Sequence, residues 1–259
     1  MRERTEELDE IPIHWWDEEG PPVLYLHGVP NSGVMWRDFL ARSGGVAVDL
    51  PGFGCSGKRA DWEYTIHGYG RFVERFVDRL GWERCRLVLH DWGVAGLTFA
   101  QAHPDRVERL ALINVVPFLP GYRWHRVARM WRTAGLGELL MGAVSRRTLR
   151  LSRRFTGLPA PLDEQVIAHF DQGTQRAILK LYRSASEEAL AAAGRRLDDV
   201  TAPALVLWGD RDPYLPARFG DGYAAALGDA TVEHLADAGH WPWLDRPDVV
   251  ARVCDWIAA

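Results

Sequence analysis

The sequence predicts an α/β fold built on a mostly parallel, doubly wound sheet, with a helical cap inserted before the late core strands. The first observation is a series of short apolar runs bounded by turn residues, at 23–28, 45–52, 86–91, 109–115 and 204–210. Such runs are typical of parallel strands that are covered on both faces. The second observation is that helical patterns lie between the runs, and this alternation favours a doubly wound parallel sheet.

The helical and late strand patterns follow in chain order. Residues 69–81 show one apolar stripe at helical spacing, and Gly81 is a stop signal at its end. The stripe consists of Phe72, Val73, Phe76, Val77 and Leu80. Alternating residues at 231–236 predict one more strand, and residues 247–258 predict a last helix that closes the sheet.

The alternation of strands and helices stops between about Pro117 and Val200, where helical patterns run without strands. An insertion at this place would lie over the strand ends, where α/β folds bind their ligands. We therefore expect residues 117–199 to form the helical cap, and residues 1–116 and 200–259 to form the core.

The composition excludes several classes of protein. The chain of 259 residues is 47% hydrophobic and 25% charged, which allows a sizeable core. Its net charge of -4 gives no general attraction to nucleic acid or to an anionic membrane. The start MRERTEELDE is too polar for a signal peptide, and no apolar run approaches the roughly 18 residues of a membrane helix. We expect a cytoplasmic monomer or homodimer that binds neither nucleic acid nor membrane.

The cysteines and the short motifs indicate no disulfide framework and no metal. Cys55, Cys85 and Cys254 are scattered and odd in number, so we expect them to be free, small, buried side chains. No metal motif such as H-E-x-x-H occurs. The chemistry derived below requires no cofactor.

A glycine-rich stretch, GFGCSG at 52–57, matches a dinucleotide-binding pattern. The context that the pattern requires is missing, because Pro51 opens the loop and the preceding strand is not the first of the chain. No acidic residue ends a following strand about 20 residues later, where a ribose would need one. We interpret this stretch as a tight connection in which glycines allow the backbone to turn.

Asp91 occupies the corner between the strand 86–91 and a following helical pattern. Hydrolases often place a serine at such an elbow, with small residues beside it that allow the sharp turn. Gly93 and Gly96 meet that need, whereas Leu89 is larger than the usual glycine and makes the corner imperfect. A carboxylate that attacks a saturated carbon forms an ordinary ester with the enzyme, so Asp91 predicts electrophilic sp3 substrates such as epoxides or alkyl halides.

Hydrolysis of that ester requires a base and a group that orients the base. His240 and Asp212 each follow a late predicted strand, and the chain order nucleophile, acid, base is that of α/β hydrolases. Asp210 is the rival acid. His90 is a poor base, because the side chain next to Asp91 on a strand points to the opposite face.

An oxyanion hole is also required, because the attack of water places negative charge on an oxygen of Asp91. The backbone N–H of Trp92, directly after the nucleophile, is one predicted donor. The other is the N–H of Val29, in the loop after the first core strand. Pro30 would hold that loop rigid.

Five stretches together carry a resemblance to a known family: HGVP, DLPGFGCSGK, HDWG, WGDRDPYLP and AGHWPWLDRP. They resemble the α/β-hydrolase enzymes of the epoxide hydrolase and haloalkane dehalogenase branch, which use an aspartate nucleophile. The resemblance covers about residues 20–116 and 200–258. It implies the α/β-hydrolase fold and a small, apolar, electrophilic substrate.

Several positions help to choose within this branch. Haloalkane dehalogenases often carry Asn or Glu where Val29 stands, and the loop looks more like the H-G-x-P of epoxide hydrolases. The indole of Trp92 could donate to a halide, although epoxide hydrolases also carry Trp there. Epoxide hydrolases resemble one another in a Tyr-Arg pair on a cap helix, where the tyrosine donates a proton. The stretch LKLYRSA at 179–185 matches this pair, so Tyr182 is the candidate proton donor. Tyr122 and His125 are further substrate-binding candidates.

The leading hypothesis is therefore an epoxide hydrolase that produces vicinal diols through an Asp91 ester. The first alternative is a haloalkane dehalogenase that uses the same ester. A non-catalytic small-molecule receptor on the same fold is the second alternative. A serine esterase is disfavoured because no serine occupies the elbow.

Overall fold

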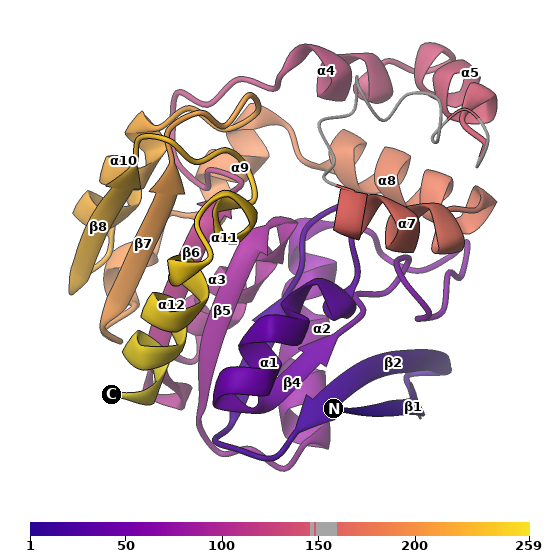
Figure 1. The fold of residues 1–259 in the computed structure, drawn as a ribbon. Helices are drawn as coiled ribbons and strands as arrows, with labels where there is room; N and C mark the ends of the chain where they lie inside the picture. Colours follow the sequence, from indigo (N-terminus) through magenta and orange to yellow (C-terminus); the bar gives the residue numbers. More distant parts are fainter. Residues whose placement is uncertain (146–147, 149–159) are drawn as a thin grey trace.

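A computed structural model describes residues 1–145, 148 and 160–259 of the chain. Eight strands form one sheet in the order β1-β2-β4-β3-β5-β6-β7-β8 (Figure 1). Their bounds are β1 (Arg2–Leu8), β2 (Ile11–Glu18), β3 (Val23–Leu26), β4 (Gly45–Val48), β5 (Cys85–Asp91), β6 (Val107–Val115), β7 (Ala204–Gly209) and β8 (Ala230–Leu235). All pairs from β4 to β8 are parallel, and only the β1–β2 and β2–β4 pairs are antiparallel. The predicted fold class is confirmed.

Helices cover both faces of this sheet. Those that pack on the sheet are α1 (Arg37–Ser43), α2 (Ile66–Arg79), α3 (Gly96–Ala102), α10 (Arg218–Ala226), α11 (Pro242–Asp245) and α12 (Asp248–Ala258). On β3, Val23 and Tyr25 belong to the apolar cluster with α1 and α12, whereas Leu24 and Leu26 belong to the cluster with α2 and α3. This two-sided burial explains why β3 is a continuous apolar run rather than an alternating one.

The remaining helices come from the part of the chain between β6 and β7. They are α4 (Arg126–Arg132), α5 (Leu136–Ala143), α7 (Ala160–His169), α8 (Gln172–Ser184) and α9 (Glu187–Ala193). Figure 1 shows α4, α5, α7 and α8 lying over the carboxyl ends of the parallel strands. The helical pattern expected within 117–199 extends over 146–147 and 149–159, which lie outside the described residues. No helix in the described parts of the chain is long and apolar enough to cross a membrane.

The amino-terminal hairpin was not predicted. In β2, Ile11, Ile13 and Trp15 alternate into the core, but β1 is polar and largely exposed along its length. Arginines of β1 hold it in place through ion pairs of Arg2 and Arg4 with Asp17 of β2. A strand stabilised by charges across an edge carries no apolar period, so its sequence gives no strand signal.

Two other expectations were wrong in detail. The predicted helix at 69–81 begins earlier, at Ile66, because the Thr65 hydroxyl accepts a hydrogen bond from Gly68 N at 2.9 Å and caps the first turn. Cys85 and Cys254 are buried, but Cys55 is exposed. Cys55 lies in the loop after β4, where its backbone N–H donates to Asp49 and its thiol lies 3.7 Å from Nδ1 of His169.

Candidate active site

The elbow at the end of β5 places Asp91 in a strained backbone conformation. Its φ of 50° and ψ of -118° lie in a region that side chains rarely occupy. The 3-10 turn η2 (Trp92–Ala95) follows at once and leads into α3. A Cβ at Gly93 would lie 2.2 Å from Leu26 O, and a Cβ at Gly28 would lie 2.3 Å from the Asp91 side chain. Only glycine at these two positions permits the turn.

Leu89 was expected to make the turn imperfect because it is larger than the usual glycine. A glycine on the helix side of the turn, Gly96, provides the space that Leu89 needs. Leu89 is fully buried, and a Cβ at Gly96 would lie 2.8 Å from its Cδ2 atom. The helix α3 therefore approaches β5 closely because Gly96, rather than residue 89, provides the space.

The two oxygens of Asp91 have different surroundings. Oδ1 accepts the N–H of Val29 at 2.8 Å, and the N–H of Trp92 also bonds the carboxylate. Oδ2 lies 3.8 Å from Nε2 of His240. Burial raises the pKa of Asp91, although His240 and the two N–H groups favour its charged form. The Val29–Pro30 peptide bond is cis. The two predicted oxyanion donors thus meet the same carboxylate.

His240 forms a close pair with Asp212, since Nδ1 lies 2.6 Å from Oδ2 of the carboxylate. Burial alone would lower the pKa of His240, but the charges of Asp212 and Asp91 outweigh it and raise the pKa. Burial likewise opposes the charge on Asp212, yet His240 and the hydrogen bonds to that carboxylate lower its pKa. The structure therefore brings together Asp91, His240 and Asp212 from three separate parts of the chain.

The rival acid lies in a different pair. Asp210 Oδ1 is 2.6 Å from Nδ1 of His234, on β8. His90 is completely buried, and its Nε2 donates to the backbone oxygen of His240 at 2.8 Å. Neither residue substitutes for Asp212 or for His240 in this geometry.

Asn114, at the end of β6, is a site residue that the sequence analysis missed. Its side-chain nitrogen donates to Asp212 Oδ2 at 2.8 Å, and its oxygen accepts the N–H of Gly209 at the same distance. Its φ is 40°, a value that Asn tolerates better than most residues. An Asn that ends an apolar strand is the signal that could have identified it.

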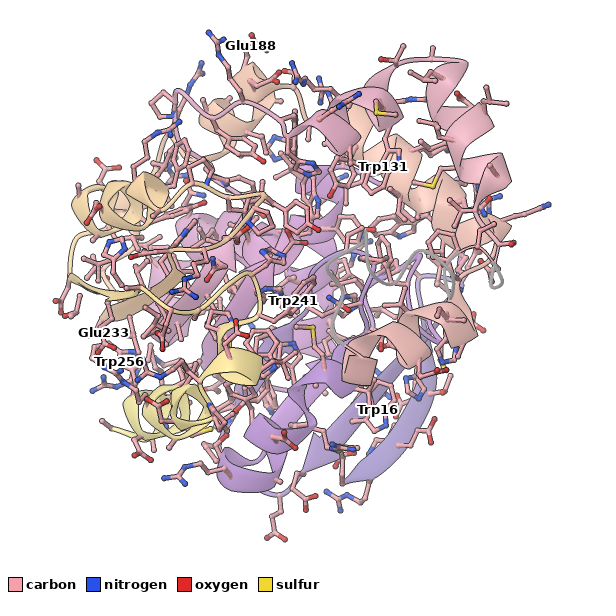
Figure 2. All side chains as sticks on the ribbon, turned by 45° about the horizontal axis from the view of Figure 1, so that its top comes forward. Trp16, Trp131, Glu188, Glu233, Trp241 and Trp256 are labelled. Carbon is pink, nitrogen blue, oxygen red and sulfur yellow. The ribbon has the colours of Figure 1, made fainter. Side chains whose placement is uncertain are left out.

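A cavity of about 450 Å³ opens above Asp91 and His240. Apolar side chains from the segment of the chain between β6 and β7 line much of it, among them Met141, Val166, Phe170 and Ile178. Trp131 of α4 and Trp241, before α11, also line it (Figure 2). No lysine or arginine is among the described lining residues, so the cavity suits an uncharged, apolar ligand.

Two tyrosines stand at the polar end of this cavity. Tyr182 of α8 is 5% exposed, and Tyr122 is 3% exposed. Burial, reinforced by the charge of Asp91, raises the pKa of both phenols. The Tyr122 hydroxyl has no hydrogen-bond partner among the described residues. Both phenols therefore line the same cavity as Asp91 and stay protonated at neutral pH.

The other two candidate binding residues also lie at the cavity. Trp92 packs edge-on against Tyr182, and its buried indole N–H lies beside that hydroxyl without hydrogen-bond geometry. His125 lines the same cavity, and its Nδ1 accepts the N–H of Ala128 at 3.3 Å. Burial lowers the pKa of His125 to about 4, so this ring is neutral near pH 7.

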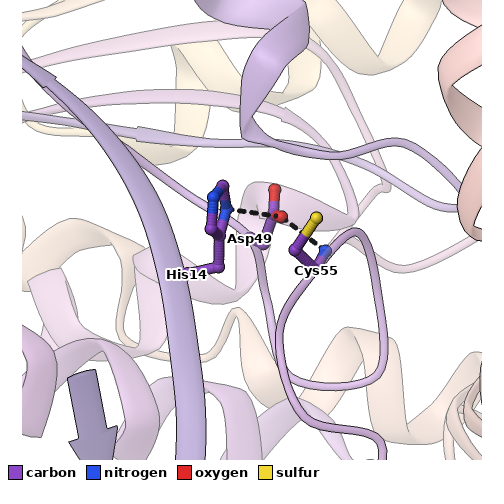
Figure 3. Close-up of side chains that lie close together, drawn as sticks. All are labelled: His14, Asp49 and Cys55. Carbon is purple, nitrogen blue, oxygen red and sulfur yellow. Dashed lines mark hydrogen bonds and ion pairs between the residues drawn. The ribbon is translucent and has the colours of Figure 1, made fainter. Parts of the chain in front are cut away.

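One cluster away from the cavity has the residue types of a metal site. Ligand atoms of His14, Asp49 and Cys55 lie within 4.8 Å of one another (Figure 3). Asp49 Oδ2 already accepts from His14 Nδ1 at 3.0 Å and from Cys55 N at 2.8 Å, and His14 Nε2 is 2.7 Å from Glu3. These bonds occupy the ligand atoms of His14 and Asp49, and Cys55 Sγ lies 3.7 Å from Nδ1 of His169. We therefore interpret the cluster as a structural connection between β2 and the loop after β4.

Comparison with known proteins identifies a family for this site. Residues 21–247 match the family model of the alpha/beta hydrolase fold. A haloalkane dehalogenase of Bradyrhizobium diazoefficiens is 28% identical in an alignment of 276 positions, gaps included, that covers 93% of this chain and 88% of that protein. A haloalkane dehalogenase of Mycolicibacterium paratuberculosis is 28% identical in an alignment of 278 positions, gaps included, that covers 99% of this chain and 88% of that protein.

Solved structures are similar over the same length. A putative ancestral haloalkane dehalogenase superposes with a TM-score of 0.83 at 26% identity and covers 98% of each chain. An epoxide hydrolase variant of Bacillus megaterium superposes with a TM-score of 0.82 at 24% identity, covering 99% of this chain and all of that one. At that identity the second likeness shows the fold alone.

Proposed function

The chain belongs to the α/β-hydrolase fold family, and from this premise we propose that it opens epoxides to vicinal diols through an ester of Asp91. The observation that carries the proposal is the pair of buried phenols, Tyr122 and Tyr182, on the same cavity as the Asp91 carboxylate. Residues 117–199 would act as the cap that supplies both phenols and excludes water from the cavity.

In the first step, Asp91 Oδ2 attacks a carbon of the epoxide ring. The bond from that carbon to the ring oxygen breaks, and the ring oxygen takes the electron pair. An alkoxide is strongly basic, so a phenol of Tyr182 or Tyr122 donates its proton as the bond breaks. The products of this step are a hydroxyalkyl ester of Asp91 and a tyrosinate.

In the second step, His240 Nε2 removes a proton from water as the water oxygen attacks Asp91 Cγ. Negative charge develops on Oδ1, where the N–H groups of Val29 and Trp92 stabilise it. The bond from Cγ to the alkyl oxygen then breaks, and His240 returns its proton to the departing diol. The proton released as Asp91 becomes a carboxylate again restores the tyrosine.

The phenols favour epoxides over alkyl halides on chemical grounds. A halide leaves as an anion and needs N–H donors around it rather than a proton. The side chain of Val29 provides no donor, and the indole N–H of Trp124 already donates to Ala185 O at 2.8 Å. An epoxide oxygen, in contrast, requires the proton that a buried phenol can give.

A haloalkane dehalogenase is the second candidate, and it has its own support. The curated relatives named above are haloalkane dehalogenases. The indole N–H of Trp92 is buried beside the site and is not engaged in a hydrogen bond among the described residues. The same Asp91 ester would form with loss of halide. A non-catalytic receptor is the third candidate, and it would need no closely paired His240 and Asp212.

The decisive experiment is the intact mass of the His240→Gln variant after mixing with substrates. Glutamine cannot act as the base, so Asp91 should still be alkylated while hydrolysis of the ester stalls. We expect an adduct that equals a whole epoxide. His234→Gln is the matched control, because His234 pairs with Asp210 outside the cavity and should turn over without an adduct.

The other masses discriminate among the candidates. An adduct that equals an alkyl halide minus hydrogen halide, with none from any epoxide, would replace the proposal by dehalogenation. No adduct from any aryl or alkyl epoxide or halide would contradict both enzymes and favour the receptor.

Removal of the phenol protons should separate the two chemistries. We expect Tyr182→Phe and Tyr122→Phe each to slow alkylation by an epoxide by about 10²-fold or more, because each loses a general acid. Alkylation by a bromoalkane should change by less than about threefold, since a halide needs no proton. Tyr25→Phe is the control, because Tyr25 bonds Ser43 on the other face of the sheet. Equal losses with both electrophiles would argue against a proton-donating role.

A further inference from the structure

The loop between β4 and α2, residues 49–65, supports the helix that carries Tyr182, and it includes the glycine-rich stretch 52–57. Side chains at three positions of α8 reach backbone oxygens of this loop. Arg176 donates to Lys58 O at 2.7 Å, and Lys180 donates to Ala60 O at 2.6 Å. The Ser184 hydroxyl lies 3.2 Å from Tyr64 O and 2.8 Å from Leu181 O of its own helix. The donors are four residues apart, so they form one stripe along α8.

A buried contact lies at the start of α8. Thr174 is 3% exposed, and its hydroxyl lies 3.1 Å from Gly52 O and 3.3 Å from His169 O. One turn further along α8, Ala177 lies close to Gly52. A Cβ built on Gly52 would lie 2.6 Å from the Cβ of Ala177. The φ of Gly52 is 94°, which also favours glycine. The backbone of the loop therefore touches the helix directly.

We propose that the contact of Gly52 with Thr174 and Ala177 is a positioning contact that sets where the Tyr182 hydroxyl stands over Asp91. This inference rests on the proposed function, in which that hydroxyl protonates the epoxide oxygen. It assigns to the glycine-rich loop a role in selecting epoxides.

The loop is rigid enough to act as a support. Asp49, completely buried at its base, accepts hydrogen bonds from Gly33 N at 2.6 Å and from Cys55 N at 2.8 Å. A Cβ at Gly54 would lie 2.1 Å from Asp49 Oδ2, so the loop closes tightly around this carboxylate. Ser56 Oγ adds a bond of 2.6 Å to Asp49 O. The loop thus has one well-determined outer surface for α8.

The spacing along α8 links this support to the active site. Thr174, Ile178 and Tyr182 are four residues apart and share one face of the helix. Ile178 and Tyr182 line the cavity, whereas Thr174 rests on the loop. Because the helix is a stiff rod, a shift at Thr174 moves Tyr182 two turns away. An error of about 1 Å at a reacting group can cost about 10²-fold in rate.

The test measures alkylation rates of Asp91 in the His240→Gln background, by mass, for one epoxide and one bromoalkane. Thr174→Val keeps the shape of the side chain but removes its hydroxyl, and we expect alkylation by the epoxide to slow by about tenfold. Alkylation by the bromoalkane should change by less than about twofold, because it needs no proton. Thr174→Ser retains the hydroxyl and should restore the epoxide rate to within about twofold of the parent.

A second substitution and a control complete the design. Ala177→Val adds bulk against Gly52 and should slow the epoxide reaction more than Thr174→Val does, again without slowing the bromoalkane. Thr133→Val is the matched control, because the Thr133 hydroxyl donates to Arg129 O at 3.0 Å and does not touch the loop. It should alter neither rate.

Other outcomes would overturn the inference. If Thr174→Val slows both electrophiles equally, or if Thr174→Ser is as slow as valine, the contact serves only the stability of the fold. If the parent forms no epoxide adduct, the proposed function fails instead. The contact is then tested by amide hydrogen exchange of residues 172–184. We expect Thr174→Val to accelerate this exchange and Thr174→Ser to leave it unchanged. Equal exchange in the two variants would overturn the proposed contact.

Discussion

Replacement of Asp91 by alanine is expected to lower epoxide turnover by at least about 10⁴-fold, because no other group can form the ester. Asp91 Oδ2 is the carboxylate oxygen that lies near His240, and the cavity opens directly above it. The remaining His240 and Asp212 could at most assist direct attack by water on the substrate. Diol formation by purified protein is the measurement.

The same variant should keep or gain stability. Burial raises the pKa of Asp91, which means that the folded protein carries this charge at a cost. Removal of the carboxylate removes that cost, so we expect a thermal midpoint equal to or above that of the wild type. Asp78→Ala is the control for activity, since Asp78 pairs with Arg106 at the exposed surface. If the Asp91→Ala variant still hydrolysed an added p-nitrophenyl ester rapidly, another residue would be the nucleophile.

The positions of Asp91, Asp212 and His240 could be predicted because each follows an apolar strand. Parallel strands place all their carboxyl ends at one edge of a sheet, so Asp91 becomes a neighbour of Asp212, which lies 121 positions further along the chain. The strands expected at 23–28 and 45–52 were predicted too long at their carboxyl ends. β3 and β4 end at Leu26 and Val48, and the residues after them belong to the loops that serve the site.

Other parts of the site could not be read from the sequence. Asn114 looks like the end of a strand, and only its bonds to Asp212 and Gly209 reveal its contribution. Tyr122 was a candidate through the family resemblance alone, because it lies in an irregular segment between β6 and α4 that has no periodic pattern to place its side chain. The stripe of donors on α8 meets backbone oxygens, and a backbone acceptor leaves no trace in residue identity.

Replacement of Asp212 by asparagine should stop the second step while it spares the first. The carboxylate holds His240 Nδ1 at 2.6 Å, and in the proposed second step it stabilises the imidazolium that forms when His240 takes a proton from water. We expect the rate of ester hydrolysis to fall by about 10⁴-fold. Alkylation of Asp91 needs no base, so the ester should accumulate on the variant and be seen by intact mass.

The neighbouring Asp210→Asn is a closely matched control. It removes the same charge two residues away, but its partner is His234, at 2.6 Å. We expect normal turnover and no accumulated ester. If Asp210→Asn stalled the ester and Asp212→Asn did not, the assignment of the acid would be reversed.

The pH dependence gives a second and independent signature of Asp212. The charges of Asp212 and Asp91 raise the pKa of His240, and only the neutral ring can act as a base, so ester hydrolysis should quicken as pH rises through that pKa. In the ester the charge of Asp91 is gone, which already lowers the pKa of His240. Asp212→Asn removes the second charge, so the inflection should move to still lower pH while the plateau falls. At the plateau His240 is neutral in the Asp212→Asn variant, so protonation of this base cannot explain the slow hydrolysis. The loss of rate must come from the lost orientation of His240 and from an imidazolium that Asp212 no longer stabilises.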